Sequence, residues 1–215
     1  MRFHALAGAV ALTLAACSTV SRDEPFSGTA GQSYVLIAID GTSKQDDTGH
    51  VFRFYPVDLA STTFQGKFVP VWFSINPLLP GHELEKPETM AALVRFGGEK
   101  IAPGDYALVS HVVTKEGPAA LNRADCYSLG APVYRFRDGT INIVPRGNAA
   151  AQDLETLQAQ VAEVLTRYPQ MTAPRALAQQ LGTASFETGR AWNGAQDCDP
   201  KGTFAFTAGK SAPPQ

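Results

Sequence analysis

The sequence predicts a mainly β (α+β) fold: an antiparallel β-sandwich with a C-terminal helical segment packed on one side. Short apolar runs rich in β-branched and aromatic residues recur between residues 33 and 144, separated by turn-forming residues. After residue 150 the apolar residues change to helical spacing. Strands first and helices late are typical of a sheet protein with its helices on one side.

The beginning of the chain has the pattern of an export signal. Arg2 is followed by an uncharged apolar run over residues 5–14, and small residues precede Cys17. A short basic start, a short apolar core and small residues at the cut mark a secretory signal. The run is too short to span a bilayer, which takes about 20 residues. We therefore expect residues 1–16 to be removed as a signal peptide.

The motif Leu14-Ala15-Ala16-Cys17 resembles the lipobox of bacterial lipoproteins. The resemblance implies that the Cys17 sulfur receives a diacylglycerol and that the new amino group is acylated, as with palmitate. Two or more acyl chains anchor a protein stably in a membrane. Ser18 stands where an aspartate would favour the inner membrane, so the pattern is similar to that of outer-membrane lipoproteins facing the periplasm. The alternative is an ordinary signal peptide with a chance cysteine.

The rest of the chain divides into three parts by composition. Residues 17–31 are rich in Ser, Thr and Gly and predict a lipidated flexible tether. Residues 32–207 suit one globular domain, with helices near 152–182, and residues 208–215 predict a disordered tail. The formal net charge is −2 and the basic residues are scattered. This distribution argues against a nucleic-acid partner.

The strand predictions follow the chain in order. Alternation, β-branched residues and flanking turns predict strands at 33–39, 51–57, 67–75, 91–96, 104–114, 133–136 and 141–144. Pro70 suggests an edge position or a bulge for the third strand. Three prolines make residues 76–90 a long loop, and Gly97-Gly98 predicts a turn. In the strand at 104–114, strict alternation places Leu108 and His111 on opposite faces, and both faces are largely apolar, as in a doubly covered strand.

The last elements are a hairpin and two helices. Asp138-Gly139 between two apolar runs predicts a β-hairpin joining 133–136 to 141–144. Leu154, Leu157, Val161, Val164, Leu165 and Tyr168 recur at helical spacing. Asn148 or Asp153 could cap that helix. Residues 172–182 predict a second short helix that ends at Gly182.

Two cysteines, Cys126 and Cys198, remain after the lipidated one. A pair of cysteines in an oxidising compartment usually forms a disulfide, which we predict here. The alternative makes Cys126 a nucleophile, with His111 as its partner.

Residues 91–145 resemble part of a known group of sandwiches. The run Pro103-Gly104-Asp105-Tyr106-Ala107-Leu108-Val109, the cysteine that follows and the segment from Tyr134 to Ile141 are similar to prealbumin-like and carboxypeptidase-regulatory-like domains. The chain looks like small bacterial lipoproteins of unknown function that carry such a sandwich. That group has no accepted catalytic residues, so the resemblance implies none here.

Motifs for catalysis and for cofactors are absent from the sequence: it has no G-x-S-x-G, P-loop, dinucleotide fingerprint or zinc-protease helix motif. His82 and the glutamates after it could offer metal ligands, but one proline-rich loop supplies too few, and we predict no metal site and no cofactor. Trp72 and Trp192 could stack on a sugar, although packing in or at the edge of the core is the more common role of a tryptophan. Trp72, His82 and Trp192 are therefore the candidate ligand-binding residues.

Together these observations predict a lipoprotein of the cell envelope. We expect it to be a non-catalytic protein-interaction or structural module, held to the membrane through Cys17 and bound to an envelope protein. The alternative is a small-ligand or glycan-binding module, and a third hypothesis is an envelope hydrolase without a recognisable motif.

Overall fold

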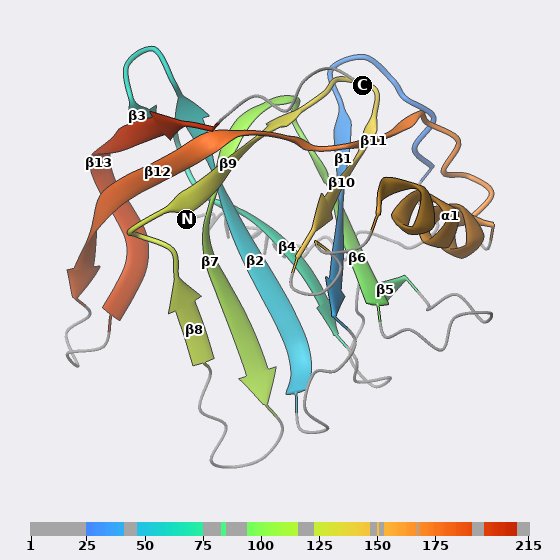
Figure 1. Cartoon of the computed structure of the whole chain (residues 1–215), viewed down its shortest axis with the longest axis horizontal. Helices are drawn as coiled ribbons and strands as arrows, with labels where there is room; N and C mark the ends of the chain where they lie inside the picture. Colours follow the sequence, from blue (N-terminus) through green and yellow to red (C-terminus); the bar gives the residue numbers. More distant parts are fainter. Residues whose placement is uncertain are drawn as a thin grey trace, which may run out of the picture.

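The structure is a computed structural model that describes residues 25–40, 47–74, 83–84, 94–115, 123–146, 150, 153–166, 168–190 and 196–209. In these residues the fold is mainly β with one α-helix, as the sequence predicts (Figure 1). The strands form two sheets.

The first sheet is mixed and has five strands. Its order is β11 (Arg175–Leu177), β10 (Ile141–Pro145), β1 (Ser33–Asp40), β6 (Val94–Ile101) and β5 (Glu83–Leu84). β10 runs parallel to both β1 and β11, whereas β6 is antiparallel to β1 and to β5. β1 is therefore the central strand of this sheet.

The second sheet is antiparallel and has eight strands. Its order is β4 (Val69–Ser74), β2 (Asp47–Asp58), β3 (Thr63–Phe64), β13 (Gln196–Ala208), β12 (Gln179–Arg190), β9 (Ala131–Phe136), β7 (Gly104–Lys115) and β8 (Arg123–Cys126). β2 also pairs with β7, so six of these strands close into a ring while β4 and β8 remain as edges. The edge position of β4 agrees with the interpretation of Pro70.

The wall formed by β2, β7 and β9 separates two cores. On one face, Phe52, Phe54, Leu108 and Phe136 pack against Val35, Ile37 and Ile39 of β1. On the other face, Tyr55, Val57, Ala107, Val109 and Val133 line the interior of the ring with Phe186 and Phe204. The alternation of side chains along each strand therefore supplies both cores at once.

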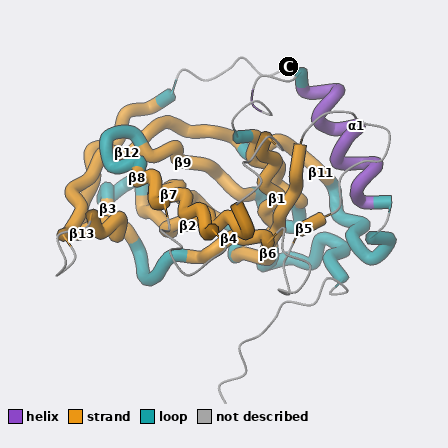
Figure 2. The backbone as a smooth tube through the Cα atoms, turned by 90° about the horizontal axis from the view of Figure 1, so that it is seen from below, coloured by secondary structure: helices purple, strands orange, loops and turns teal. Residues whose placement is uncertain are grey.

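The single helix of the described chain, α1 (Leu154–Leu165), covers the outer face of the first sheet (Figure 2). Leu157, Val161 and Val164 pack on Leu36 and Ile143. Asp153 caps the helix by accepting a hydrogen bond from the Thr156 N–H at 2.8 Å, which is one of the two caps expected. β1 is thus covered on both faces, which explains its continuous apolar sequence.

The prediction of a second helix at 172–182 is wrong. This segment forms β11 and the start of β12 instead, where Ala178 N–H donates to Ile143 O at 2.8 Å. Gly182 does not end a helix: a Cβ there would overlap the Thr207 carbonyl of the neighbouring strand. Pairing with β10 and β9 outweighs the local helical spacing, because most secondary-structure stability comes from tertiary packing.

The prediction that 133–136 and 141–144 pair as a hairpin is also wrong. β9 and β10 belong to different sheets, so the turn at 137–140 carries the chain from one sheet to the other. The buried amide of Asn142 accepts from Arg137 N–H at 2.9 Å and donates to Thr140 O at 2.9 Å, which shapes the turn. Gly139 has φ +61°, as expected for glycine in such a turn.

The boundary expected for the tether lies too late in the chain. Phe26 is 1% exposed and packs in the core under α1. Its N–H donates to Gln170 O at 3.1 Å, and its carbonyl accepts from Thr172 N–H at 3.1 Å. Residues 25–31 therefore belong to the domain. At the other end, Ala208 still belongs to β13, and residues 1–24 and 210–215 lie outside the described residues.

Gly97-Gly98 lies inside β6 rather than in the predicted turn. The ring of Tyr34, on the neighbouring strand β1, occupies the space that a Cβ at Gly98 would need. Glycine is required here by the close approach of an aromatic ring to the backbone, not by a turn.

Replacing Gly98 by alanine should therefore destabilise the protein by about 1–3 kcal/mol, because the added methyl group must displace the Tyr34 ring or the strand. Equilibrium urea unfolding of the oxidised protein measures this loss. Gly130→Ala is the matched control, because nothing lies within 4 Å of a Cβ at that position. Equal unfolding free energies for the two variants would contradict the explanation.

Candidate functional site

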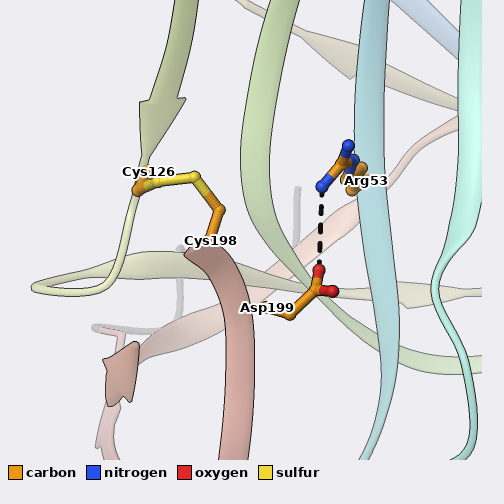
Figure 3. The surroundings of a disulfide bond; sticks show 4 residues. All are labelled: Arg53, Cys126, Cys198 and Asp199. Atoms are coloured by element: carbon orange, nitrogen blue, oxygen red, sulfur yellow. Dashed lines mark ion pairs between the residues drawn. A yellow bond between two sulfur atoms is a disulfide. The ribbon is translucent and has the colours of Figure 1, made fainter. Parts of the chain in front are cut away.

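The predicted disulfide links β8 to β13 through Cys126 and Cys198. Cys126 ends β8, Cys198 lies in β13, and their Cα atoms are 5.4 Å apart across a sequence separation of 72 (Figure 3). Cys198 is 4% exposed. With both sulfurs bonded to each other, neither cysteine can act as the nucleophile of the alternative hypothesis in this oxidised form.

An ion pair lies beside the disulfide and holds the same strand. Arg53 Nη1 of β2 is 3.6 Å from Asp199 Oδ1, and Figure 3 shows Cys198 joined to Cys126 and Asp199 joined to Arg53. The Arg53 guanidinium also lies over the Phe68 ring, 4.9 Å from its centroid. Both charged side chains are about a third or more exposed, so water weakens the ion pair and the disulfide is the stronger link.

Of the three candidate ligand-binding residues, only Trp72 lies among the described residues. Trp72 lies in β4 at the register position opposite Val51. His82 and Trp192 lie outside the described residues, as does Cys17. The ligand-binding and lipidation roles of these residues remain predictions.

Two histidines form a pair that sequence reasoning did not find. His50 of β2 is 4% exposed, and its Nδ1 lies 2.9 Å from His111 Nε2 of β7. One ring donates and the other accepts, so at least one of the two is neutral in this pair. His111 also stacks on Phe52, with ring centroids 4.2 Å apart and planes 4° from parallel.

The face of His111 differs from the one that strict alternation predicts. The pairing of β2 with β7 shifts register between Arg53 and Phe54, so Phe52 is opposite His111 while Phe54 is opposite Leu108. His111 and Leu108 therefore share the face that looks toward the first sheet. A bulge of this kind leaves no clear sign in one sequence, and the His50 pairing spans 61 residues.

Arg146, Tyr127 and Tyr134 form a second polar cluster. Arg146 follows β10, Tyr134 lies in β9, and Tyr127 follows β8. The guanidinium donates hydrogen bonds to both tyrosine hydroxyls, and its Cζ lies 5.1 Å from the centroid of the Tyr127 ring. Sequence reasoning missed this cluster, and only the alternation that turns Tyr134 inward could have indicated part of it.

The surroundings of the cluster change its proton affinities. Burial raises the pKa of Tyr134 above its ordinary value, and Arg146 partly offsets this rise. Burial lowers the pKa of Arg146, but the two tyrosines outweigh it, so the pKa lies above its usual value. At neutral pH the cluster therefore holds the positive charge of Arg146 beside the protonated phenol of Tyr134.

A groove of about 630 Å³ runs between α1 and the strands β10 and β11. Its polar side chains are Glu155, Gln158 and Arg175, and small residues such as Ala159 and Ala162 form much of the rest. This volume falls in the range of small-ligand sites, roughly 300–1,000 Å³. The groove is open to solvent, and its two charges of opposite sign are exposed.

Two further properties concern only the described residues. They contain no group of three or more His, Cys, Asp or Glu side chains placed to hold a metal ion. Nor do they contain a helix with the length and apolar character needed to cross a bilayer.

Comparison with known protein families, with curated proteins and with solved structures finds no match to this chain. The resemblance to prealbumin-like and carboxypeptidase-regulatory-like sandwiches therefore stays a prediction.

Replacing both Cys126 and Cys198 by serine should lower the free energy of unfolding by about 4 kcal/mol, because the crosslink closes a long loop and restricts the unfolded chain. Urea unfolding of the oxidised protein and of the double variant measures the difference. Dithiothreitol should lower the midpoint of the natural protein and leave that of the double variant unchanged. If dithiothreitol leaves the urea midpoint of the natural protein unchanged, the disulfide contributes little to its stability.

Proposed function

We propose that this protein is a lipid-anchored lipoprotein of the cell envelope, acting as a non-catalytic protein-interaction or structural module. The proposal places the lipid on Cys17 and the domain at the outer membrane, facing the periplasm. The lipobox-like Leu14-Ala15-Ala16-Cys17 supports the anchor.

The disulfide is the single observation that best supports export. Disulfides persist in oxidising compartments such as the periplasm and are rare in the cytosol. Cys126 and Cys198 come together from β8 and β13, far from the signal-like start of the chain. This support is therefore independent of the first seventeen residues.

The short distance along the chain from Cys17 to Phe26 supports a role close to the membrane. Phe26 is fixed in the core under α1, and residues 18–25 are all that separate it from Cys17. A chain of this length spans at most roughly 30 Å when fully extended. A lipid on Cys17 would therefore keep the α1 side of the domain near the bilayer.

The sheet edges support an interaction role. The first sheet ends at β11 and β5, and the second ends at β4 and β8. An edge strand presents backbone donors and acceptors to which a partner's extended segment can pair. The buried apolar side chains pack against one another in three cores, so a partner would meet the strand edges and not these side chains.

The second candidate function is a small-ligand or glycan-binding module. The groove beside α1 favours it, because its volume of about 630 Å³ suits a small molecule. In that case purified protein should show a saturable change in tryptophan fluorescence when cell-wall fragments are added. A flat response across such fragments would count against this candidate.

Labelling of growing bacteria with radioactive palmitate tests the anchor. The natural protein should take up label and float with membranes, whereas Cys17→Ala should do neither, because the thiol that receives the lipid is gone. The double variant Cys126→Ser/Cys198→Ser is the matched control and should still be labelled. Equal labelling of Cys17→Ala would remove the basis for the anchor.

Crosslinking in intact cells tests the interaction role. Tagged protein is crosslinked and purified, and the captured proteins are identified by mass spectrometry, with Cys17→Ala as the unanchored control. We expect one dominant envelope protein, lost in the control because that variant is released from the membrane. The same background proteins in both samples would speak against the interaction role.

A further inference from the structure

The Arg146 cluster lies between the two sheets near the ends of β1 and β10. Arg146 N–H donates to Ala38 O at 2.7 Å, which fixes its backbone beside β1. Tyr134 belongs to the core between the sheets, and Tyr127 packs against it. Tyr134 is 5% exposed, while Arg146 and Tyr127 are only partly buried. The cluster is therefore held by both sheets and still reaches the surface.

The three side chains together are rich in donors and poor in acceptors. A guanidinium has only N–H donors, and a phenol can accept and donate at once. Because each hydroxyl accepts from Arg146, each keeps its own O–H as a donor. In the described part of the chain no carboxylate is paired with Arg146. Among the described residues, one positive charge and two hydroxyl donors thus converge without an anion.

Such a set of groups is complementary to an oxyanion. A buried charge is normally paired, because two neutral phenols cannot offset the loss of hydration as an anion can. The planar fork of arginine matches two oxygens of a carboxylate or phosphate group. The Tyr127 ring holds the guanidinium in place, which lowers the entropy lost when the fork engages a ligand.

We propose that Arg146, Tyr127 and Tyr134 form a binding site for an oxyanion, the carboxylate or phosphate group of a small ligand. Arg146 supplies the charge and those N–H donors that are not bonded to the tyrosine hydroxyls. The hydroxyls of Tyr127 and Tyr134 donate to the remaining oxygens. This site is distinct from the groove beside α1 and does not depend on the lipid anchor.

The experiment uses the full-length oxidised protein and three salts at equal ionic strength: sodium phosphate, sodium acetate and sodium chloride. Thermal unfolding and isothermal titration calorimetry are followed in each. Phosphate, acetate or both should raise the unfolding temperature above that in chloride in a saturable way, because a ligand that binds only the folded protein stabilises it. Which salt acts decides between a phosphate and a carboxylate ligand. No rise above chloride with either salt would overturn the proposal.

Variants localise the effect. Tyr127→Phe and Tyr134→Phe each remove one donor and keep the ring, and each should weaken binding about tenfold, as expected for one hydrogen bond. Arg146→Lys keeps the charge but loses the fork, and it should bind at least tenfold more weakly. Tyr168→Phe, in the core under α1, is the matched control and should bind as the natural protein does.

A purely structural cluster gives a different result. The variants would then lower the unfolding temperature by the same amount in all three salts, and that outcome would overturn the proposal. If Arg146→Lys does not fold, as judged by near-ultraviolet circular dichroism, the two tyrosine variants still decide the question. Palmitate labelling is independent of all these measurements, so a failure of the anchor and a failure of this site are distinguishable.

Discussion

The structure depends on one wall of three strands, β2, β7 and β9, that is buried on both faces. A slip of one residue in any of these strands would exchange the side chains of the two cores. The two faces are not interchangeable, because large aromatic rings such as Phe54 and Phe136 face the first sheet, whereas the residues that β7 and β9 contribute to the apolar core of the ring are Ala and Val. A six-stranded ring is narrow, and Phe186 and Phe204 from the opposite side fill it. The register of the wall is therefore fixed from both sides.

The ring has its fewest paired residues where β13 meets β3. β13 meets β3 through a single pair of residues, Thr203 and Thr63, while its pairing with β12 shifts register twice. Side-chain links hold β13 where backbone hydrogen bonds are few: Cys198 is bonded to Cys126 of β8, and Asp199 pairs with Arg53 of β2. A disulfide gains most when it closes a long loop, and β13 is far in sequence from both partners. The bond thus stabilises the part of the fold that backbone pairing secures least.

Strands and the helix α1 could be predicted from the sequence wherever the local apolar pattern matches the face that the fold buries. The 33–39 prediction nearly equals β1, and the helical spacing of Leu157, Val161 and Val164 marks the face that packs on the sheet. The errors share another cause, because each depends on a partner distant in the sequence. Gly98 is explained only by Tyr34, and the turn before Asn142 is locally correct but joins two sheets. The disulfide followed from counting cysteines, whereas neither the His50–His111 pair nor the Arg146 cluster could be found without the strand pairing.

The two candidate binding regions differ in how far their charged and polar groups are exposed to water. The charges in the groove beside α1, Glu155 and Arg175, are solvated and cost the fold little. The layer between the sheets instead holds the buried His50 and the Arg146 guanidinium among aromatic rings. Apolar side chains at such positions would often be neutral or stabilising, so local choices that cost stability are expected mainly where a protein functions. By this argument the layer between the sheets, near the ends of β1 and β10, is a better candidate for a ligand site than the groove.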